Sequence, residues 1–245
     1  NGGNRKYDVY LFVFPALGLT TADWFNGRVL STVATFGPYF ALNSRMYDYV
    51  GKSEGIRYIE TTCAHEFFHG IQFAYNVFMP TWFMEASATW SESKVYAGGR
   101  INGEIGETDA YNYYSGQLRR WFLQPDIALD SRESDHEYGS VIWVFYMAER
   151  FGADIVRQFY GNTTEGNFRE LGNFFQVFID HGKTLVEAFK TFTVWNYFTY
   201  DRDDEQHYFN GRRFPPVAIH PNDVHRSYPV RVDFDSESMP EHSSS

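Results

Sequence analysis

The feature that most restricts the fold is a long helical pattern that begins near Ile56 and is ended by Pro80. At 3.6 residues per turn, nearly all apolar side chains of this stretch fall within an arc of about 180° on one side of the helix. His65, Glu66 and His69 lie outside that arc. The pattern therefore predicts a helix that buries one face in a core and groups two imidazoles and a carboxylate on another side.

Strand patterns precede this helix. Residues 6–14 are aromatic and β-branched, which is typical of a buried strand. Residues 38–44 have the pattern of a second strand, since proline is tolerated at a strand start. Residues 15–37 contain three glycines, which indicates a loop or a short strand.

Helical patterns dominate the rest of the chain. A second helix is predicted over residues 82–95, with Thr81 as a suitable N-cap. The glycine-rich residues 97–110 predict a mobile surface loop. Further helices are predicted over residues 111–123, 139–151, 153–160, 173–180 and 184–199. Strands first and helices afterwards favour the α+β class over a doubly wound fold.

This order of elements predicts one domain over residues 1–200 and an extension over residues 201–245. The domain would contain a sheet and the histidine-bearing helix within about residues 1–96, and a mostly helical subdomain within about residues 111–200. The extension is rich in proline and ends in serines, which is typical of a disordered end.

Composition and charge exclude several classes of function. The net charge of −10, without a basic cluster, argues against a nucleic-acid-binding protein. The chain has no run of 18 apolar residues, so we expect no membrane span. It begins with Asn-Gly-Gly and not with Met, which fits a processed and secreted protein.

The helix that carries the histidines has the parts of a catalytic zinc site. Two histidines four residues apart can bind one ion, and Glu66 between them can take a proton from water at that ion. Catalytic zinc needs a third protein ligand, and we expect Glu85, sixteen residues after His69, because an antiparallel second helix would return it to the first. Glu92 lies on the same helical face as Glu85 and suits a hydrogen bond to a ligand imidazole, with Thr89 as the alternative.

The segments His-Glu-Phe-Phe-His and Trp-Phe-Met-Glu-Ala-Ser-Ala resemble the gluzincins, which are zinc metallopeptidases with two motif histidines and a helical glutamate. The resemblance implies a zincin-like fold, with a small mixed sheet whose edge strand binds a peptide substrate over the His-Glu-x-x-His helix. That edge strand would be residues 38–44. The resemblance also points to Tyr138 as donor to the transition-state oxyanion, with His136 as its substitute.

The expected function is hydrolysis of peptide bonds, with water activated by zinc and Glu66, by a secreted endopeptidase. An aminopeptidase is one alternative, and a catalytically inactive, zinc-stabilised binding or scaffold domain is another. The intact Glu66 argues against the scaffold, since a structural zinc site needs no base. Calcium could bind the acidic run at residues 201–205, although the run lacks the ligand spacing of a calcium-binding loop.

Overall fold

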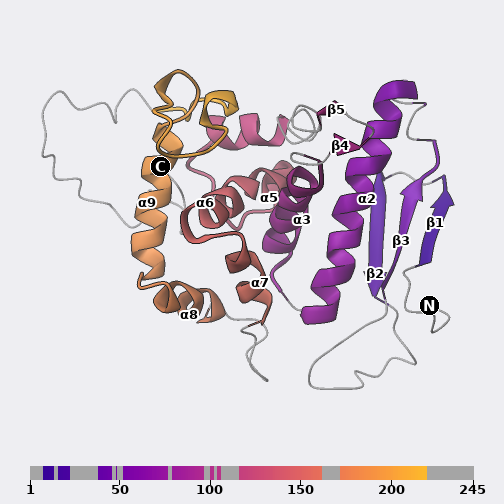
Figure 1. The fold of residues 1–245 in the computed structure, drawn as a ribbon, viewed down its shortest axis with the longest axis horizontal. Coiled ribbons are helices and arrows are strands. Elements are labelled where there is room, and N and C mark those ends of the chain that lie inside the picture. Colours follow the sequence, from indigo (N-terminus) through magenta and orange to yellow (C-terminus); the bar gives the residue numbers. More distant parts are fainter. Residues whose placement is uncertain are drawn as a thin grey trace, which may run out of the picture.

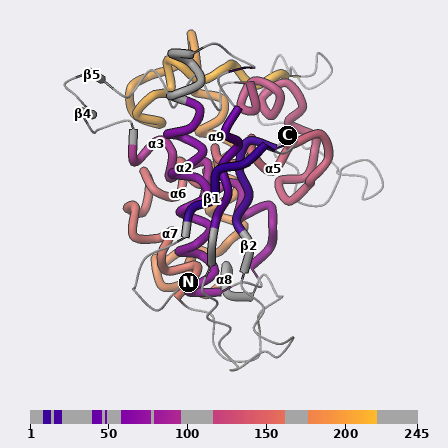
Figure 2. The backbone as a smooth tube through the Cα atoms, turned by 90° about the vertical axis from the view of Figure 1, so that its right-hand side faces the viewer, coloured from indigo at the N-terminus to yellow at the C-terminus, as the bar shows by residue number. Residues whose placement is uncertain are grey.

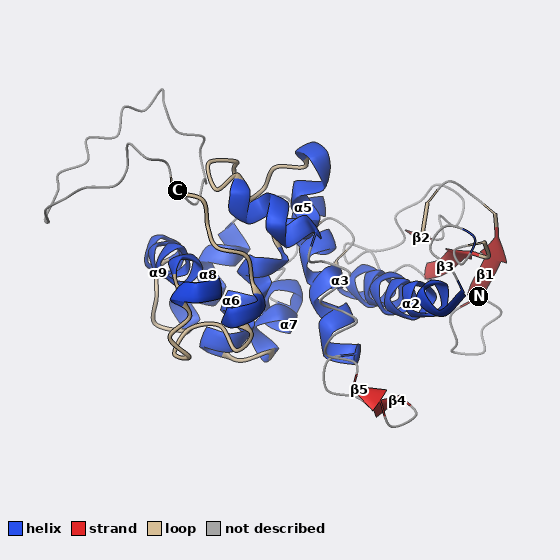
Figure 3. Cartoon of the chain, turned by 90° about the horizontal axis from the view of Figure 1, so that it is seen from above, coloured by secondary structure: helices blue, strands red, loops and turns tan. Residues whose placement is uncertain are grey.

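The molecule has a small sheet at one end and a helical body at the other (Figure 1). The computed structural model describes residues 8–13, 16–22, 38–45, 48, 52–76, 79–96, 100–101, 104–105, 116–161 and 172–219. The long helix α2 (Lys52–Tyr75) runs between the sheet and the other helices, as the view from above also shows (Figure 3). Strands followed by a mostly helical remainder agree with the predicted α+β class.

The N-terminal sheet is mixed and has three strands, β1 (Asp8–Phe12), β2 (Gly18–Ala22) and β3 (Pro38–Asn43). The spatial order is β1-β3-β2, with β3 parallel to β1 and antiparallel to β2. In Figure 2 the sheet faces the viewer, in front of the helices. β1 and β3 confirm the strands predicted near residues 6–14 and 38–44, and β2 is the short strand that the glycine-containing segment allowed. The prediction that residues 6–14 are buried was wrong, because β1 is an edge strand whose apolar side chains from Val9 to Phe12 are exposed.

The position of residues 38–44 in the sheet differs from the prediction of an edge strand. β3 is the central strand, and β2 is the edge that flanks α2. The physical reason lies in three consecutive buried residues of β3, Phe40, Ala41 and Leu42. A strand that is apolar on both faces belongs in the middle of a sheet, whereas an edge strand alternates or contains polar residues. The Thr-Thr pair at residues 20–21 of β2 fits the edge better.

The second helix, α3 (Thr81–Tyr96), follows α2 closely and packs against it. The carbonyl of Pro80 accepts hydrogen bonds from the backbone N–H groups of Phe83 and Met84, at 3.0 and 3.1 Å. Pro80 therefore occupies the cap position, and Thr81, the predicted N-cap, is the first helical residue. Proline has no backbone N–H, so moving the cap from Thr81 to Pro80 leaves no additional N–H group without a hydrogen-bond partner.

Part of the predicted glycine-rich surface loop forms a small hairpin. β4 (Arg100–Ile101) and β5 (Glu104–Ile105) pair antiparallel, so the structure replaces an irregular loop by two short strands at these positions.

The helical body follows the predicted pattern with shifted bounds. It contains a helical segment over residues 116–123, α5 (His136–Gly139), α6 (Val141–Phe151), α7 (Asp154–Gly161), α8 (Gly172–Asp180) and α9 (Leu185–Tyr197), and the short 3₁₀ turns η1 (Glu133–Asp135), η2 (Tyr200–Arg202) and η3 (Gly211–Arg213). The helix predicted over 139–151 corresponds to α6, and the single turn α5 that precedes it was not predicted. Gly182 ends α8 with φ of 70°, as a helix C-cap glycine does, and Thr184 and Glu187 form a capping box on α9.

The core of this body is aromatic and extends past residue 200. Trp143 packs edge-on against Phe192 with 4.9 Å between ring centroids. Tyr208 and Phe214 are almost fully buried in the same core, although the domain was predicted to end at residue 200. The proline-rich and serine-rich tail beyond residue 219 lies outside the described residues. Each helix in the described ranges is too short or too polar to cross a bilayer.

Candidate metal centre

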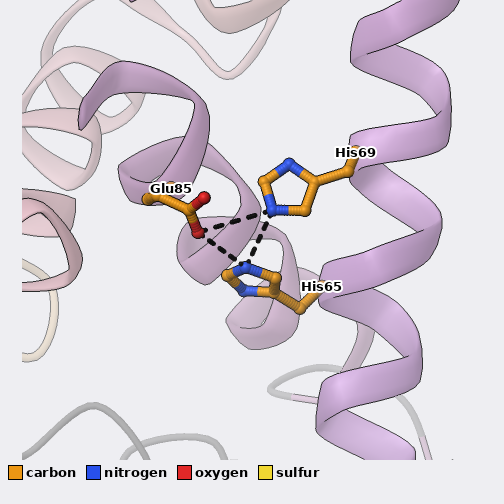
Figure 4. A group of neighbouring side chains, drawn as sticks. All are labelled: His65, His69 and Glu85. Carbon is orange, nitrogen blue, oxygen red and sulfur yellow. Dashed lines mark hydrogen bonds and ion pairs between the residues drawn. The ribbon is translucent and has the colours of Figure 1, made fainter. Parts of the chain in front are cut away.

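Three predicted ligands converge between α2 and α3 (Figure 4). Nε2 of His65 lies 3.0 Å from Nε2 of His69 and 3.1 Å from Oε2 of Glu85, and the third side of this triangle measures 3.4 Å. Ligand atoms about 2.1 Å from a tetrahedral zinc ion are about 3.4 Å apart. The triangle therefore has the size of three corners of such a tetrahedron and leaves the fourth corner for another ligand.

The local geometry follows from the sequence. Residues four apart on α2 lie one above the other, so both imidazoles project from one face. The short connection at Pro80 returns α3 along α2, which places Glu85 in the first two turns of α3 opposite the histidines. His65 and His69 are buried, and Glu85 is largely buried, so bulk water does not screen the charges of the three groups.

Hydrogen bonds on the outer side of each imidazole fix its orientation. Nδ1 of His65 lies 2.7 Å from Oε1 of Glu92, and Nδ1 of His69 lies 2.7 Å from Oε1 of Gln72. Both partners are acceptors, so each Nδ1 carries the proton and each Nε2 faces the triangle. Two Nε2 atoms and a carboxylate oxygen that face one another attract a positive charge, which is the chemistry of a cation site.

The pKa values of the buried histidine and glutamates show the same preference of the site for positive charge. Burial lowers the pKa of His65, but hydrogen bonds to Glu85 and Glu92 outweigh it and raise this pKa to about 10. Burial raises the pKa of Glu85, yet its hydrogen bonds to His65 and His69 lower it far below the usual range. Burial raises the pKa of Glu92, against the opposing effect of His65. The pKa shifts of His65 and Glu85 reflect the negative charge that the two glutamates place around His65.

Glu66, the predicted base, lies on α2 beside His65 but faces the sheet. The hydroxyl of Thr20 on β2 lies 2.5 Å from Oε2 of Glu66 and 2.8 Å from the backbone carbonyl of Glu66. Gly18 of β2 also packs on this side chain, since an added Cβ there would lie 2.6 Å from Cγ of Glu66. The edge strand therefore holds the carboxylate of Glu66 in place.

The two predicted oxyanion donors have different surroundings. The ring of Tyr138 on α5 lies 6.1 Å from the ring of His65, so its phenol is near the ligands. Burial, and then the charge of Glu85, raises the pKa of Tyr138, which keeps it a proton donor at neutral pH. His136 stacks on Trp121 at 6.0 Å, and burial lowers its pKa to about 4. The stacking partner of His136 is therefore not one of the three ligands, and its role as substitute donor stays a prediction.

Sequence reasoning missed three residues at this site. Gln72 lies three positions after His69 on α2, and this helical spacing was a usable signal. Thr20 had no signal, because only strand pairing brings it to Glu66. Glu137 on α5 has a buried carboxylate oxygen without a hydrogen-bond partner, and burial raises its pKa, which the charge of Glu85 raises further.

The acidic run at residues 201–205, which was considered for calcium, forms local turns. Oδ1 of Asp203 accepts from the backbone of Glu205 at 3.2 Å, and Oδ1 of Asp204 accepts from the backbone of Gln206 at 3.0 Å. Among the described residues, the group with metal-binding geometry is His65, His69 and Glu85.

Comparisons with protein-family models, curated proteins and solved structures found no match to this chain. The geometry of the site therefore carries the functional conclusion by itself.

Proposed function

We propose that this protein is a zinc-dependent peptidase of the gluzincin type, with a zincin-like arrangement of sheet and active-site helix. The observation that carries the proposal is the triangle of His65, His69 and Glu85, with an outer hydrogen bond on each imidazole. A glutamate next to the first ligand and a tyrosine beside the triangle add the groups that hydrolysis requires.

The donor set supports zinc over other common ions. Calcium and magnesium prefer six or more oxygen ligands, whereas two imidazoles and one carboxylate are a frequent ligand set of catalytic zinc. Bound zinc supplies a Lewis acid that polarises a carbonyl and lowers the pKa of coordinated water to about 7.

Glu66 is proposed as the general base. Glu66 directly follows the ligand His65 in the sequence. Its side chain is buried, so bulk solvent does not reach the carboxylate. Thr20 holds one carboxylate oxygen, Oε2, and the other, Oε1, packs beside Gly18 of β2. We assign to Oε1 the role of taking the proton of the attacking water and later delivering it to the leaving amine.

Tyr138 is proposed as the donor to the oxyanion that forms on the peptide carbonyl. A phenol whose pKa is raised remains protonated and can donate its hydrogen as negative charge develops. Such a donor acts mainly in the transition state, so it contributes to the rate and little to substrate binding.

The substrate is proposed to be an extended peptide that pairs with β2. β2 is an edge strand and its Thr20 contacts Glu66, so a peptide added to this edge would run past the base. This assignment replaces residues 38–44, which are central in the sheet. An added strand of either direction can continue past the site, which favours cleavage within a chain over cleavage at its end.

The test is cleavage of an unstructured protein such as casein by the purified chain, with and without a chelator. We expect cleavage that the chelator abolishes and added Zn²⁺ restores. Glu66→Gln should retain Zn²⁺ and lose turnover by about 10²–10⁴-fold, the usual contribution of a general base. A folded, zinc-loaded wild type without cleavage, or full activity in Glu66→Gln, would refute the proposal and favour a zinc-stabilised scaffold.

A further inference from the structure

The amide of Gln72 is completely buried beneath the ligand His69. Its Oε1 lies 2.7 Å from Nδ1 of His69, and its Nε2 donates to the backbone carbonyl of Met84 at 2.9 Å and to Oγ of Ser87 at 3.0 Å. Gln72 is 1% exposed and Ser87 is fully buried, so none of these bonds competes with water. Gln72 therefore links the ligand on α2 to the backbone and a side chain of α3.

These contacts determine which way the amide faces. A backbone carbonyl can only accept, so the NH₂ group of Gln72 must point to Met84. Oε1 must then point to His69, and an amide oxygen only accepts. Nδ1 of His69 is consequently the protonated nitrogen, and the lone pair of Nε2 faces the metal triangle.

The chain of hydrogen bonds continues to α7. The hydroxyl of Ser87 donates to the carbonyl of Phe83 at 2.6 Å and lies 2.8 Å from the hydroxyl of Tyr160. Ser87 has a single proton, so Tyr160 is the donor in the second bond. Burial raises the pKa of Tyr160, which keeps that proton in place.

The partners of the two ligand imidazoles differ in charge. His65 has the carboxylate of Glu92, whereas His69 has a neutral amide. Glu85, Glu92 and Glu66 already place three carboxylates around the centre, and a further carboxylate beside His69 would add another buried negative charge. A neutral acceptor fixes the tautomer without adding that charge.

We propose that Gln72 is the positioning residue of His69, and that Ser87 and Tyr160 hold the Gln72 amide in the orientation that the metal site requires. The proposal deepens the proposed function and rests on His69 as a ligand. It makes α7, which contributes no ligand, a support of the metal centre.

The test compares Zn²⁺ affinity, measured by competition with a chromophoric chelator, in four variants. Gln72→Leu should bind Zn²⁺ about 10–100-fold more weakly than wild type, the usual cost of losing such a partner. Tyr160→Phe, which keeps the volume of the side chain, should weaken binding less than Gln72→Leu. Gln72→Glu keeps the acceptor for His69 and should bind Zn²⁺ more tightly than Gln72→Leu. Asn196→Leu is the matched control, since it removes a buried amide that bonds Tyr208 and should leave Zn²⁺ affinity unchanged.

A direct signature comes from the imidazole proton. In the zinc-loaded wild type, a long-range ¹H–¹⁵N spectrum should show a protected proton on Nδ1 of His69, and Gln72→Leu or, if that variant does not fold, Tyr160→Phe should make it exchange faster. Unchanged Zn²⁺ affinity and proton exchange in these variants would overturn this proposal while the metal site stands. A wild-type chain that binds no Zn²⁺ would overturn the proposed function, and this proposal with it.

Discussion

Gly18→Ala tests how closely the edge strand controls the proposed base. A Cβ at Gly18 would lie 2.6 Å from Cγ of Glu66 and 2.6 Å from Cγ2 of Thr62, whereas ordinary contacts begin at 3.4 Å. Oε1 of Glu66 lies closer still, so relief of this overlap requires the Glu66 side chain and the strand to separate by at least the difference, 0.8 Å. A displacement of about 1 Å at a catalytic group can cost about 10²-fold in rate, or roughly 2.7 kcal/mol in the activation free energy.

We therefore expect Gly18→Ala to lower kcat by about two orders of magnitude and to retain Zn²⁺, because the atoms nearest the added Cβ belong to Glu66 and Thr62 and not to a ligand. The assay is cleavage of casein, together with the metal content and the melting temperature. Gly161→Ala is the matched control, since a Cβ there would meet no described atom within 4 Å. Full activity in a folded, zinc-loaded Gly18→Ala would refute the reasoning, because it would show that the observed position of Glu66 against β2 is not its working position.

Three further predictions concern the surroundings of the site. Glu92→Leu should weaken Zn²⁺ binding about 10–100-fold, because His65 loses the acceptor that orients it, and chelator competition measures this. Tyr138→Phe should lower kcat about 10²-fold with KM and Zn²⁺ affinity unchanged, and an equal loss in KM would argue against an oxyanion donor. Burial lowers the pKa of His136 from 6.5 to about 4, so between these pH values the unfolded chain binds a proton that the folded chain does not, and stability should fall as the pH falls through this window. Urea unfolding at pH 7 and pH 5 should show a smaller loss in His136→Gln than in wild type, and equal losses would contradict the assignment.

The ligands could be predicted from the sequence because their geometry is local. His65 and His69 are separated by one helical turn, and this spacing alone places them on one face of α2. Glu85 and Glu92 needed one further step, the return of α3 along α2, which the short connection at Pro80 makes almost unavoidable. Gln72 obeys the same helical spacing, but a glutamine three residues after a histidine is common on helices and indicates a ligand partner only once Met84 and Ser87 are seen to orient it.

The surroundings of the base could not be predicted because they depend on pairing between distant segments. β2 is five residues long and has no apolar alternation, so its place in the sheet follows from the rest of the fold and not from its own pattern. Residues 38–44 were correctly predicted as a strand, but the order of strands is decided by burial on both faces, which a single segment does not reveal. The surroundings of His136 could not be predicted for a similar reason, since its ring packs on Trp121 from another helical segment.

The proposed site thus divides into two parts with different structural supports. The metal ligands and their outer partners belong to α2, α3 and α7, which pack as one helical unit. The base is held by β2, whose pairing in the described part of the chain is with β3 alone. The strand that would bind the substrate is therefore also the strand that positions Glu66. A shift of β2 on peptide binding would reach the carboxylate of Glu66 directly through Thr20. The imidazoles and Glu85 are held by side-chain partners on α2 and α3, so mutations in β2 should lower turnover more than metal affinity.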